Sequence, residues 1–159
     1  MSIPVSIAEF RSVLSVWPSG VTVVSSRFGD DHRVITVSAF CSVSLEPPLI
    51  LVCVNNESSA LPTILQSGVI AVNVLSQEQK DVAAQGSSKV RVGLGDIAHT
   101  LGANGCALVV GAAGGLECDV WKSDVVGDHT VVYGLVTAVH VGEATPLLYH
   151  QRRYGSFTG

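Results

Sequence analysis

Short valine-rich segments separated by turn residues occupy most of the sequence from residue 20 onward, and they constrain the fold more than any other feature. Strands are predicted for residues 20–26, 34–40, 49–54, 69–75, 116–122 and 129–141. Short runs of β-branched residues bounded by Gly, Pro, Asn, Asp or Ser are typical of strands. Helices do not alternate regularly with these segments, which argues against a doubly wound parallel sheet. The pattern predicts a mainly β protein with a closed or nearly closed antiparallel barrel.

Three short helices are expected beside these strands. The clearest covers residues 6–17, where Phe10, Val13, Leu14 and Trp17 share one face of a 3.6-residue period. Ser6 and Glu9 have the spacing of a capping box at its start.

The other two helices are predicted from their end signals. The second covers residues 59–67, with Ser58 or Ser59 as the N-cap and Gly68 as the C-terminal stop. The third begins at Ser76. The less periodic stretch 85–105 is predicted to be a long excursion, and residues 146–159 form a polar and aromatic tail.

Composition limits the class of protein. The chain has 159 residues, 47% of them hydrophobic, and a net charge of -4 from 9 basic and 13 acidic side chains. We expect a single domain over residues 1–159, located in the cytoplasm, with no membrane span and no signal peptide. The small number of Lys and Arg residues disfavours nucleic acid as a partner. Low charge beside abundant apolar residues predicts a homodimer.

Cysteine usage and the common catalytic motifs exclude several classes. The four cysteines (Cys41, Cys53, Cys106 and Cys118) lie in apolar segments without a C-x-x-C pair, which predicts buried, reduced thiols and no metal site. The sequence has no dinucleotide-binding G-x-G-x-x-G after a strand, no P-loop and no G-x-S-x-G elbow. Classical hydrolase and metalloenzyme functions are therefore disfavoured.

Small hydroxyl side chains at even positions distinguish the segment 36–44. Thr36, Ser38, Ser42 and Ser44 would share one face of a pleated strand, and Pro47-Pro48 would then end its pairing. Such a face suits an extended ligand that carries carbonyls, ring nitrogens and a phosphate. The alternative is a half-exposed strand whose hydroxyls face water.

Three further groups are candidates for anion binding. Ser58 and Ser59 open a predicted helix, where free amides attract anions, although simple capping would also explain them. Lys89 and Arg91 lie in the long excursion and could fold over a ligand or be solvated. His129 could donate to a second anionic substrate, together with the cluster 152–154, or be an ordinary turn residue.

Taken together, these segments resemble the flavin reductase-like family, whose members have an FMN-binding split barrel. The similar segments, in family order, are residues 20–24, 36–49, 67–68, 71–76, 116–118, 127–130, 146–150 and 153–155. The resemblance implies a six-stranded antiparallel split barrel with a Greek key, homodimeric, that reduces FMN or FAD with NADH or NADPH. It further implies that the free reduced flavin is supplied to a partner monooxygenase.

The resemblance also implies roles for individual residues. The expected flavin contacts are Thr36, Val37, Ser38, Ala39, Ser42, Val43, Ser44, Asn55, Ser58, Ser59, Lys89 and Arg91. The expected nicotinamide contacts are His129, Arg152, Arg153, Tyr154 and Gly155. Because hydride passes directly between the two nucleotides, no protein acid or base is expected to be catalytic, and His129 has a supporting role.

The sequence departs from the family at three places in the outer pocket. No aromatic residue follows the basic residue in 89–92, Gly114-Gly115 stands where large side chains are common, and Val34-Ile35 replaces a frequent His-Gly pair. The preference for FMN or FAD is left open by these changes. A flavin- or haem-binding barrel without reductase activity is the alternative function. A split-barrel oxidase of a phosphorylated vitamer and a barrel that only mediates protein contacts are further alternatives.

Overall fold

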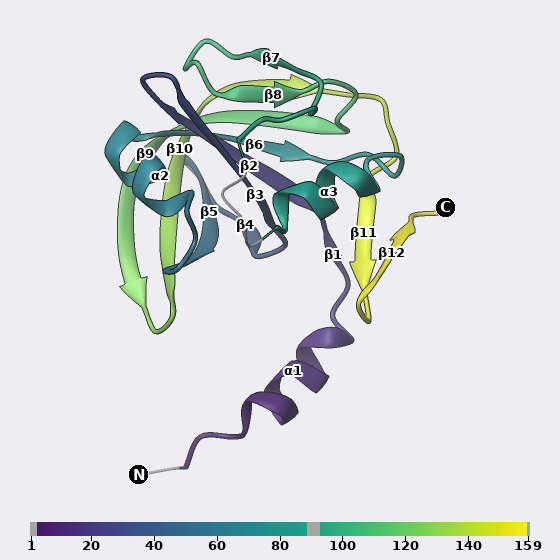
Figure 1. Cartoon of the computed structure of the whole chain (residues 1–159). Coiled ribbons are helices and arrows are strands. Elements are labelled where there is room, and N and C mark those ends of the chain that lie inside the picture. Colours follow the sequence, from purple (N-terminus) through teal and green to yellow (C-terminus); the bar gives the residue numbers. More distant parts are fainter. Residues whose placement is uncertain (1–2, 89–92, 159) are drawn as a thin grey trace.

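A closed antiparallel barrel forms the body of the protein (Figure 1). The computed structural model describes residues 3–88 and 93–158. Its main sheet has the order β3-β2-β6-β9-β10-β5-β4. These strands are β2 (Thr22–Phe28), β3 (Asp31–Val37), β4 (Phe40–Leu45), β5 (Pro48–Asn55), β6 (Val69–Val74), β9 (Gly114–Val126) and β10 (His129–Val141).

The two ends of this sheet order are consecutive in the chain, which closes the barrel. Only Ser38 and Ala39 separate β3 from β4, and the amide of Cys53 donates to the carbonyl of Ala39 at this corner, 3.0 Å away. Counted as one bent strand, β3 and β4 give a six-stranded barrel. The order β6-β2-β3/β4-β5 places the fourth strand beside the first, which is a Greek key. The predicted fold class is thus confirmed for the single chain.

Within residues 3–88 and 93–158, three short helices accompany the barrel, namely α1 (Ile7–Ser15), α2 (Leu61–Ser67) and α3 (Lys80–Gly86). The predicted capping box at the start of α1 is present, with Ser6 and Glu9 bonded to each other's backbone N–H. The structure ends α2 at Gly68, whose φ of +69° is a left-handed conformation that glycine adopts without steric cost. Among the described residues, no helix is long and apolar enough to cross a membrane.

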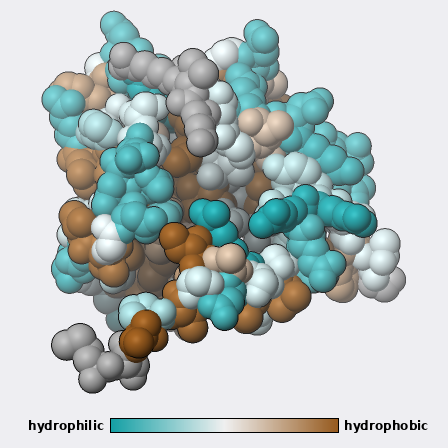
Figure 2. Space-filling model, turned by 60° about the horizontal axis from the view of Figure 1, so that its bottom comes forward, coloured by the Kyte–Doolittle hydropathy of each residue, from teal (hydrophilic) through white to brown (hydrophobic). Residues whose placement is uncertain are grey.

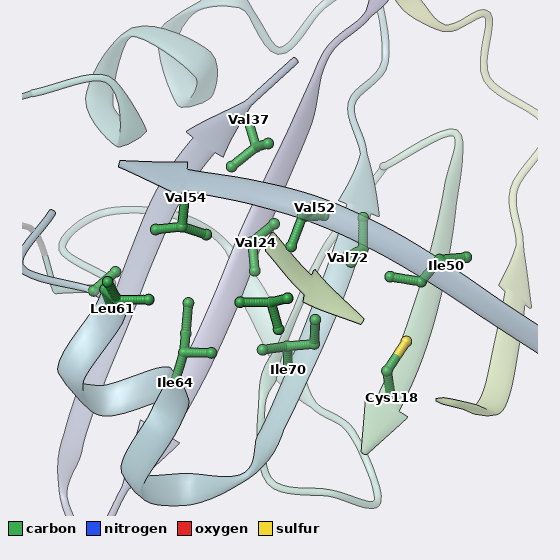
Figure 3. Packing of buried hydrophobic residues seen from close by; sticks show 12 residues of the cluster. Val24, Val37, Ile50, Val52, Val54, Leu61, Ile64, Ile70, Val72 and Cys118 are labelled. Carbon is green, nitrogen blue, oxygen red and sulfur yellow. The ribbon is translucent and has the colours of Figure 1, made fainter. Parts of the chain in front are cut away.

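Valine and isoleucine side chains from all parts of the barrel fill its interior (Figure 3). Leu61 and Ile64 of α2 pack beside them and cover one open end. A second cluster, around Leu75 and Leu147, lies under α3 and the C-terminal tail. Together, these two hydrophobic clusters fix the positions of the strands that border the pockets described below.

Small sheets outside the barrel organise the excursion and the tail. In the excursion, β7 (His99–Leu101) pairs with β8 (Ala107–Val109). The tail forms a hairpin of β11 (Leu147–His150) and β12 (Arg153–Ser156), and β11 also pairs with β1 (Ser19–Gly20). The sequence pattern predicted neither pair, because strands of two to four residues show too little alternation to be recognised.

Four local predictions were wrong. The N-cap of α2 is Ala60 rather than Ser58 or Ser59, because the Ser58 hydroxyl accepts the Ala60 amide in a turn before the helix. The segment 34–40 is split by the corner at residues 38–39. The third helix begins at Lys80, although the Ser76 amide does donate to the Gln79 side chain. Of the four cysteines, only Cys106 and Cys118 are buried, since the outer side of β4 leaves Cys41 exposed.

Candidate functional site

A polar pocket of about 630 Å³ lies where the end of β3 meets the turn after β5 and the end of α3. We call it the hydroxyl pocket. Its lining residues are Val34, Ile35, Thr36, Asn55, Glu57, Ser58, Ser59, Gly86, Ser87 and Ser88. Four of the predicted flavin contacts, at positions 36, 55, 58 and 59, therefore lie together although they come from separate segments.

Hydrogen bonds within the chain hold the hydroxyl pocket in shape. The Thr36 hydroxyl donates to the carbonyl of Ala83 on α3 at 2.7 Å. The Asn55 side-chain oxygen accepts the amide of Glu57 at 2.8 Å, which forms an Asx turn. Among the described residues that line this pocket, none is Lys or Arg.

A second pocket, of about 780 Å³, lies between α1, the β3–β4 corner and the tail hairpin. We call it the arginine pocket. It is lined by Arg11, Leu14, Ser15, Trp17, Ser19, Ser38, Ala39, Phe40, Cys41, Leu51, Cys53, Tyr149 and Arg152. Two predicted flavin contacts, Ser38 and Ala39, thus share a cavity with a predicted nicotinamide contact, Arg152.

The two pockets adjoin the same bent strand. On the bent strand, Thr36 lines the hydroxyl pocket and Ser38 lines the arginine pocket. On β5, Asn55 lines the hydroxyl pocket and Cys53 lines the arginine pocket. A ligand that extends along the corner could therefore contact both. The aromatic side chains at positions 17, 40 and 149 give the arginine pocket the flat apolar surfaces that a planar ring system prefers.

The tail hairpin separates the predicted nicotinamide contacts into two groups. Arg152 lines the arginine pocket, whereas Arg153, Tyr154 and Gly155 line another cavity of about 450 Å³. The Tyr154 ring packs on the Tyr149 ring with their centroids 5.4 Å apart. Tyr154 therefore also contributes to the packing of the tail.

His129 begins β10 next to the hydroxyl pocket. It is the register partner of Asn55 on β5, and its Nδ1 lies 2.7 Å from the Asp128 carboxylate. The hydrogen bond and charge of His129 lower the pKa of Asp128. An imidazole oriented by a carboxylate, with a side chain about 42% exposed, is suited to donate a hydrogen bond to a ligand.

The remaining predicted flavin contacts do not line either of these two pockets in the described part of the chain. The Val37 side chain is buried in the core. Ser42, Val43 and Ser44 follow on β4, where a register shift breaks the alternation of faces that the sequence pattern suggested. Lys89 and Arg91 lie outside the described residues. Their roles stay predictions.

Sequence reasoning missed several residues that line these pockets. Ser87 follows α3 and reaches the hydroxyl pocket, while Arg11, Trp17 and Tyr149 reach the arginine pocket. The sequence signals were the apolar face of the first helix, which includes Trp17, and the aromatic tail, which includes Tyr149. Neither signal pointed to Arg11 or Ser87. Among the described residues, no group of three His, Cys, Asp or Glu side chains could hold a metal ion.

Comparison with known proteins adds an independent line of evidence. Residues 14–158 match the family model described as "Flavin reductase like domain". The chain is 37% identical over 146 residues to the reductase component of 4-hydroxyphenylacetate 3-monooxygenase from Thermus thermophilus, covering 91% of this chain and 93% of the relative. It is 35% identical over 166 residues to "Flavin reductase (NADH)" from Kitasatospora aureofaciens, covering 97% and 87%.

Solved structures agree with this result. BorF, the flavin reductase component of a bacterial two-component tryptophan halogenase, superposes with a TM-score of 0.90 at 30% identity, covering 97% of this chain and 99% of BorF. The NADH:FAD oxidoreductase SgcE6 of Streptomyces globisporus, in complex with NAD and FAD fragments, gives a TM-score of 0.89 at 31% identity, covering 95% and 92%. The likeness extends over nearly the whole of each molecule.

Proposed function

Because the chain belongs to the flavin reductase-like family, we propose that it oxidises NADH or NADPH and reduces FMN or FAD. The observation that supports this most strongly is the family match over residues 14–158. Relatives named as flavin or FMN reductases agree in activity. We further propose that residues 1–159 form one domain of this family.

The residues at the two pockets fit a flavin nucleotide. Flavins combine a planar tricycle with a polyhydroxyl chain and a phosphate. The arginine pocket offers aromatic surfaces beside Ser38 and Ala39, and the hydroxyl pocket offers Thr36 and the serines of the turn after β5. Volumes of about 780 and 630 Å³ lie in the range of small-molecule sites. When bound, the flavin supplies the hydride acceptor.

The chain's own residues position the reactants in this proposal. The corner at residues 38–39 is held by a backbone hydrogen bond and the Asx turn by the bond from the Glu57 amide to the Asn55 side chain, so the polar groups around them are fixed before a ligand arrives. His129 and Arg152 hold the nicotinamide nucleotide. Most of these contacts are neutral hydroxyl and backbone groups, which suits a flavin that binds reversibly and leaves in its reduced form.

The predicted site residues remain part of the proposal. Flavin contacts are assigned to Thr36, Val37, Ser38, Ala39, Ser42, Val43, Ser44, Asn55, Ser58, Ser59, Lys89 and Arg91. Nicotinamide contacts are assigned to His129, Arg152, Arg153, Tyr154 and Gly155. For Val37 the contact is through its backbone, because its side chain lies in the core.

We propose that the partner is a flavin-dependent monooxygenase that receives reduced flavin by diffusion. Relatives are reductase components of monooxygenases, and BorF belongs to a tryptophan halogenase, so the partner enzyme can differ within the family. A cytoplasmic location agrees with four cysteines that form no disulfide.

Helix α1 supports the proposed homodimer. It extends away from the barrel (Figure 1), and its apolar residues are exposed, with 57% of Phe10 and 51% of Leu14 accessible; Trp17, just after the helix, is 75% accessible. Figure 2 shows apolar side chains along this helix on the face that comes forward. A second copy of the chain would bury them. The double substitution of Phe10 and Leu14 by Ser should convert a dimer to a monomer in analytical ultracentrifugation, whereas a wild-type monomer would refute the dimer.

Spectrophotometry tests the activity directly. Purified protein mixed with NADH or NADPH and either FMN or FAD should consume the reduced nucleotide, seen as loss of its absorbance band, well above the rate with flavin alone. A protein that binds flavin without consuming NADH or NADPH would be the non-catalytic carrier instead. A haem spectrum after purification would point to the haem-binding alternative.

A further inference from the structure

Two of the cationic side chains of this chain line the same pair of adjoining cavities. The sequence has nine Lys and Arg residues. Two of them, Arg11 and Arg152, both line the arginine pocket, and both also line a neighbouring cavity of about 490 Å³ between α1 and the tip of the tail hairpin. No Asp or Glu among the described residues lines either cavity. Two guanidinium groups shared by adjoining cavities create a positive potential there.

Neither guanidinium is neutralised by a carboxylate within the described part of the chain. The ion pairs there that involve Lys or Arg belong to Arg33 and Lys122. The pKa of Asp128 is lowered mainly by the hydrogen bond and charge of His129, and Arg11 adds a smaller effect. Arg11 is thus close enough to the turn before β10 to act on it electrostatically, but it is not paired.

The position of Arg152 is fixed relative to α1. The amide of Gln151 donates to the carbonyl of Ser15, the last residue of α1, at 2.9 Å. Gln151 and Arg152 have φ values of +48° and +63°, which make the tip of the hairpin a tight two-residue turn. The turn therefore holds the backbone of Arg152 beside the helix that carries Arg11.

A purely structural role would explain only one of the two arginines. A cation near the C-terminus of α1 interacts favourably with the helix dipole, and Arg152 is placed for this beside Ser15. Arg11 lies in the middle of α1, where the dipole offers no such gain. A ligand with two negative charges accounts for both.

We propose that Arg11 and Arg152 together bind the diphosphate group of a dinucleotide. This assignment rests on the proposed function and extends it to Arg11 of α1, for which neither the motifs nor the resemblance suggested a role. Guanidinium groups bind phosphate oxygens through two parallel hydrogen bonds, so two of them match two phosphates. Both NADH and FAD contain a diphosphate, whereas FMN and reduced nicotinamide mononucleotide do not.

Paired substrates test the proposal. Arg11→Gln and Arg152→Gln are compared with wild type and with Lys80→Gln, which removes an exposed cation that lines none of the cavities described above. The Kd values of FAD and FMN are measured by fluorescence titration. The KM values of NADH and reduced nicotinamide mononucleotide are measured with FMN as acceptor. Thermal melting checks that each variant is folded.

Each arginine variant should raise either the Kd of FAD or the KM of NADH about tenfold, which corresponds to the loss of one charge-assisted contact. A rise for FAD but not for FMN assigns the site to the flavin diphosphate. A rise for NADH but not for the mononucleotide assigns it to the nicotinamide dinucleotide. Lys80→Gln should change neither.

Two results would overturn the inference. One is that folded variants leave both the Kd of FAD and the KM of NADH unchanged. The other is that a variant weakens binding of a dinucleotide and of its mononucleotide by the same factor. Failure of the proposed function is recognised separately, because wild type would then consume no NADH with either flavin. The comparison of FAD and FMN binding could still be made.

Discussion

The hydroxyl pocket and the arginine pocket adjoin one bent strand but use their polar groups differently. In the hydroxyl pocket, the side chains of Thr36, Asn55 and Ser58 are already hydrogen-bonded within the chain. In the arginine pocket, Arg11 and Arg152 form no ion pair among the described residues. The hydroxyl pocket therefore supplies a fixed shape, and the arginine pocket supplies positive charge that is available to a ligand. Shape and charge can be changed separately, so the contribution of each to ligand binding can be measured.

The largest effect is expected where the two pockets meet. Ser38→Tyr places a ring in the cavity between α1 and the corner, and it should weaken flavin binding about 100-fold through direct overlap. Fluorescence titration with FMN and FAD measures this. Ser42→Tyr is the matched variant on exposed β4, and it should also block flavin if the ligand extends along this strand. Normal binding by Ser38→Tyr would remove the corner from the site.

A change at the opposite end of β10 from His129 should affect stability and leave both pockets intact. Glu117 is buried, its carboxylate accepts the Asn104 amide at 2.9 Å, and it lies 2.8 Å from His140 Nε2. His140→Ala removes one partner and should lower the free energy of unfolding by about 2 kcal/mol. Urea unfolding measures the loss, and KM for NADH should be unchanged. An altered KM would show that this end of the barrel is coupled to the site.

The pH dependence of this pair has a definite sign. Burial acts to raise the pKa of Glu117, but the hydrogen bonds from Asn104 and His140 outweigh it and hold the pKa below its ordinary value of 4.5. A carboxylate with a lowered pKa stabilises the fold above 4.5, and this stability is lost as the pH falls through the lowered value. His140→Ala should therefore show a smaller loss of stability than wild type between pH 5 and about pH 3.

The barrel could be predicted from sequence more fully than the site. Strand β10 was predicted with its observed bounds, because thirteen residues of strand character between clear turn signals leave little freedom. The closure of the sheet depends on two residues, Ser38 and Ala39, whose bend has no local signature. The even spacing of hydroxyls suggested one continuous face, yet the corner and the register shift in β4 interrupt it.

The composition of the arginine pocket could not be read from the sequence. Arg11 and Trp17 come from the N-terminal segment, Cys53 from β5 and Arg152 from the tail, and only the closed fold brings these three segments to one cavity. The resemblance identified Arg152 because it lies in a motif, whereas Arg11 lies in an amphipathic helix of ordinary appearance. Thr36 was recognised from the even spacing of hydroxyl residues in its segment, whereas Asn55 was assigned only through the family resemblance.

His129 tests whether the hydroxyl pocket side also contacts the nicotinamide nucleotide. His129→Ala should raise KM for NADH about tenfold and leave the Kd of flavin near normal, because one hydrogen bond to an anionic substrate is lost. Steady-state kinetics with saturating FMN measure the first value. His129→Gln retains a donor and should recover part of the loss. An unchanged KM in His129→Ala would identify His129 as an ordinary turn residue.

The fixed shape of the hydroxyl pocket can be loosened without changing charge. Thr36→Val keeps the volume but removes the hydrogen bond to Ala83 that ties β3 to α3. We expect a loss of about 1 kcal/mol in the free energy of unfolding and a few-fold weaker binding of flavin. Thr36→Ser restores the hydroxyl and should behave like wild type. If flavin binding were unaffected by Thr36→Val, the attachment of α3 would not matter for the site.

The smallest effect concerns the turn that positions the charge. Gln151 has a φ of +48°, which costs a non-glycine residue about 1 kcal/mol, and glycine would remove this strain at some cost in unfolded-state entropy. Gln151→Gly should therefore stabilise the fold by about 0.5 kcal/mol, measured as a small rise in Tm. The amide bond to Ser15 is retained, so KM for NADH should not change. Gln151→Pro removes that amide and should raise KM even if the protein folds, because Arg152 would no longer be fixed beside α1. Equal KM values for the glycine and proline variants would mean that Arg152 does not need a fixed position to act on NADH. The arginine pocket would then differ from the hydroxyl pocket only in its positive charge.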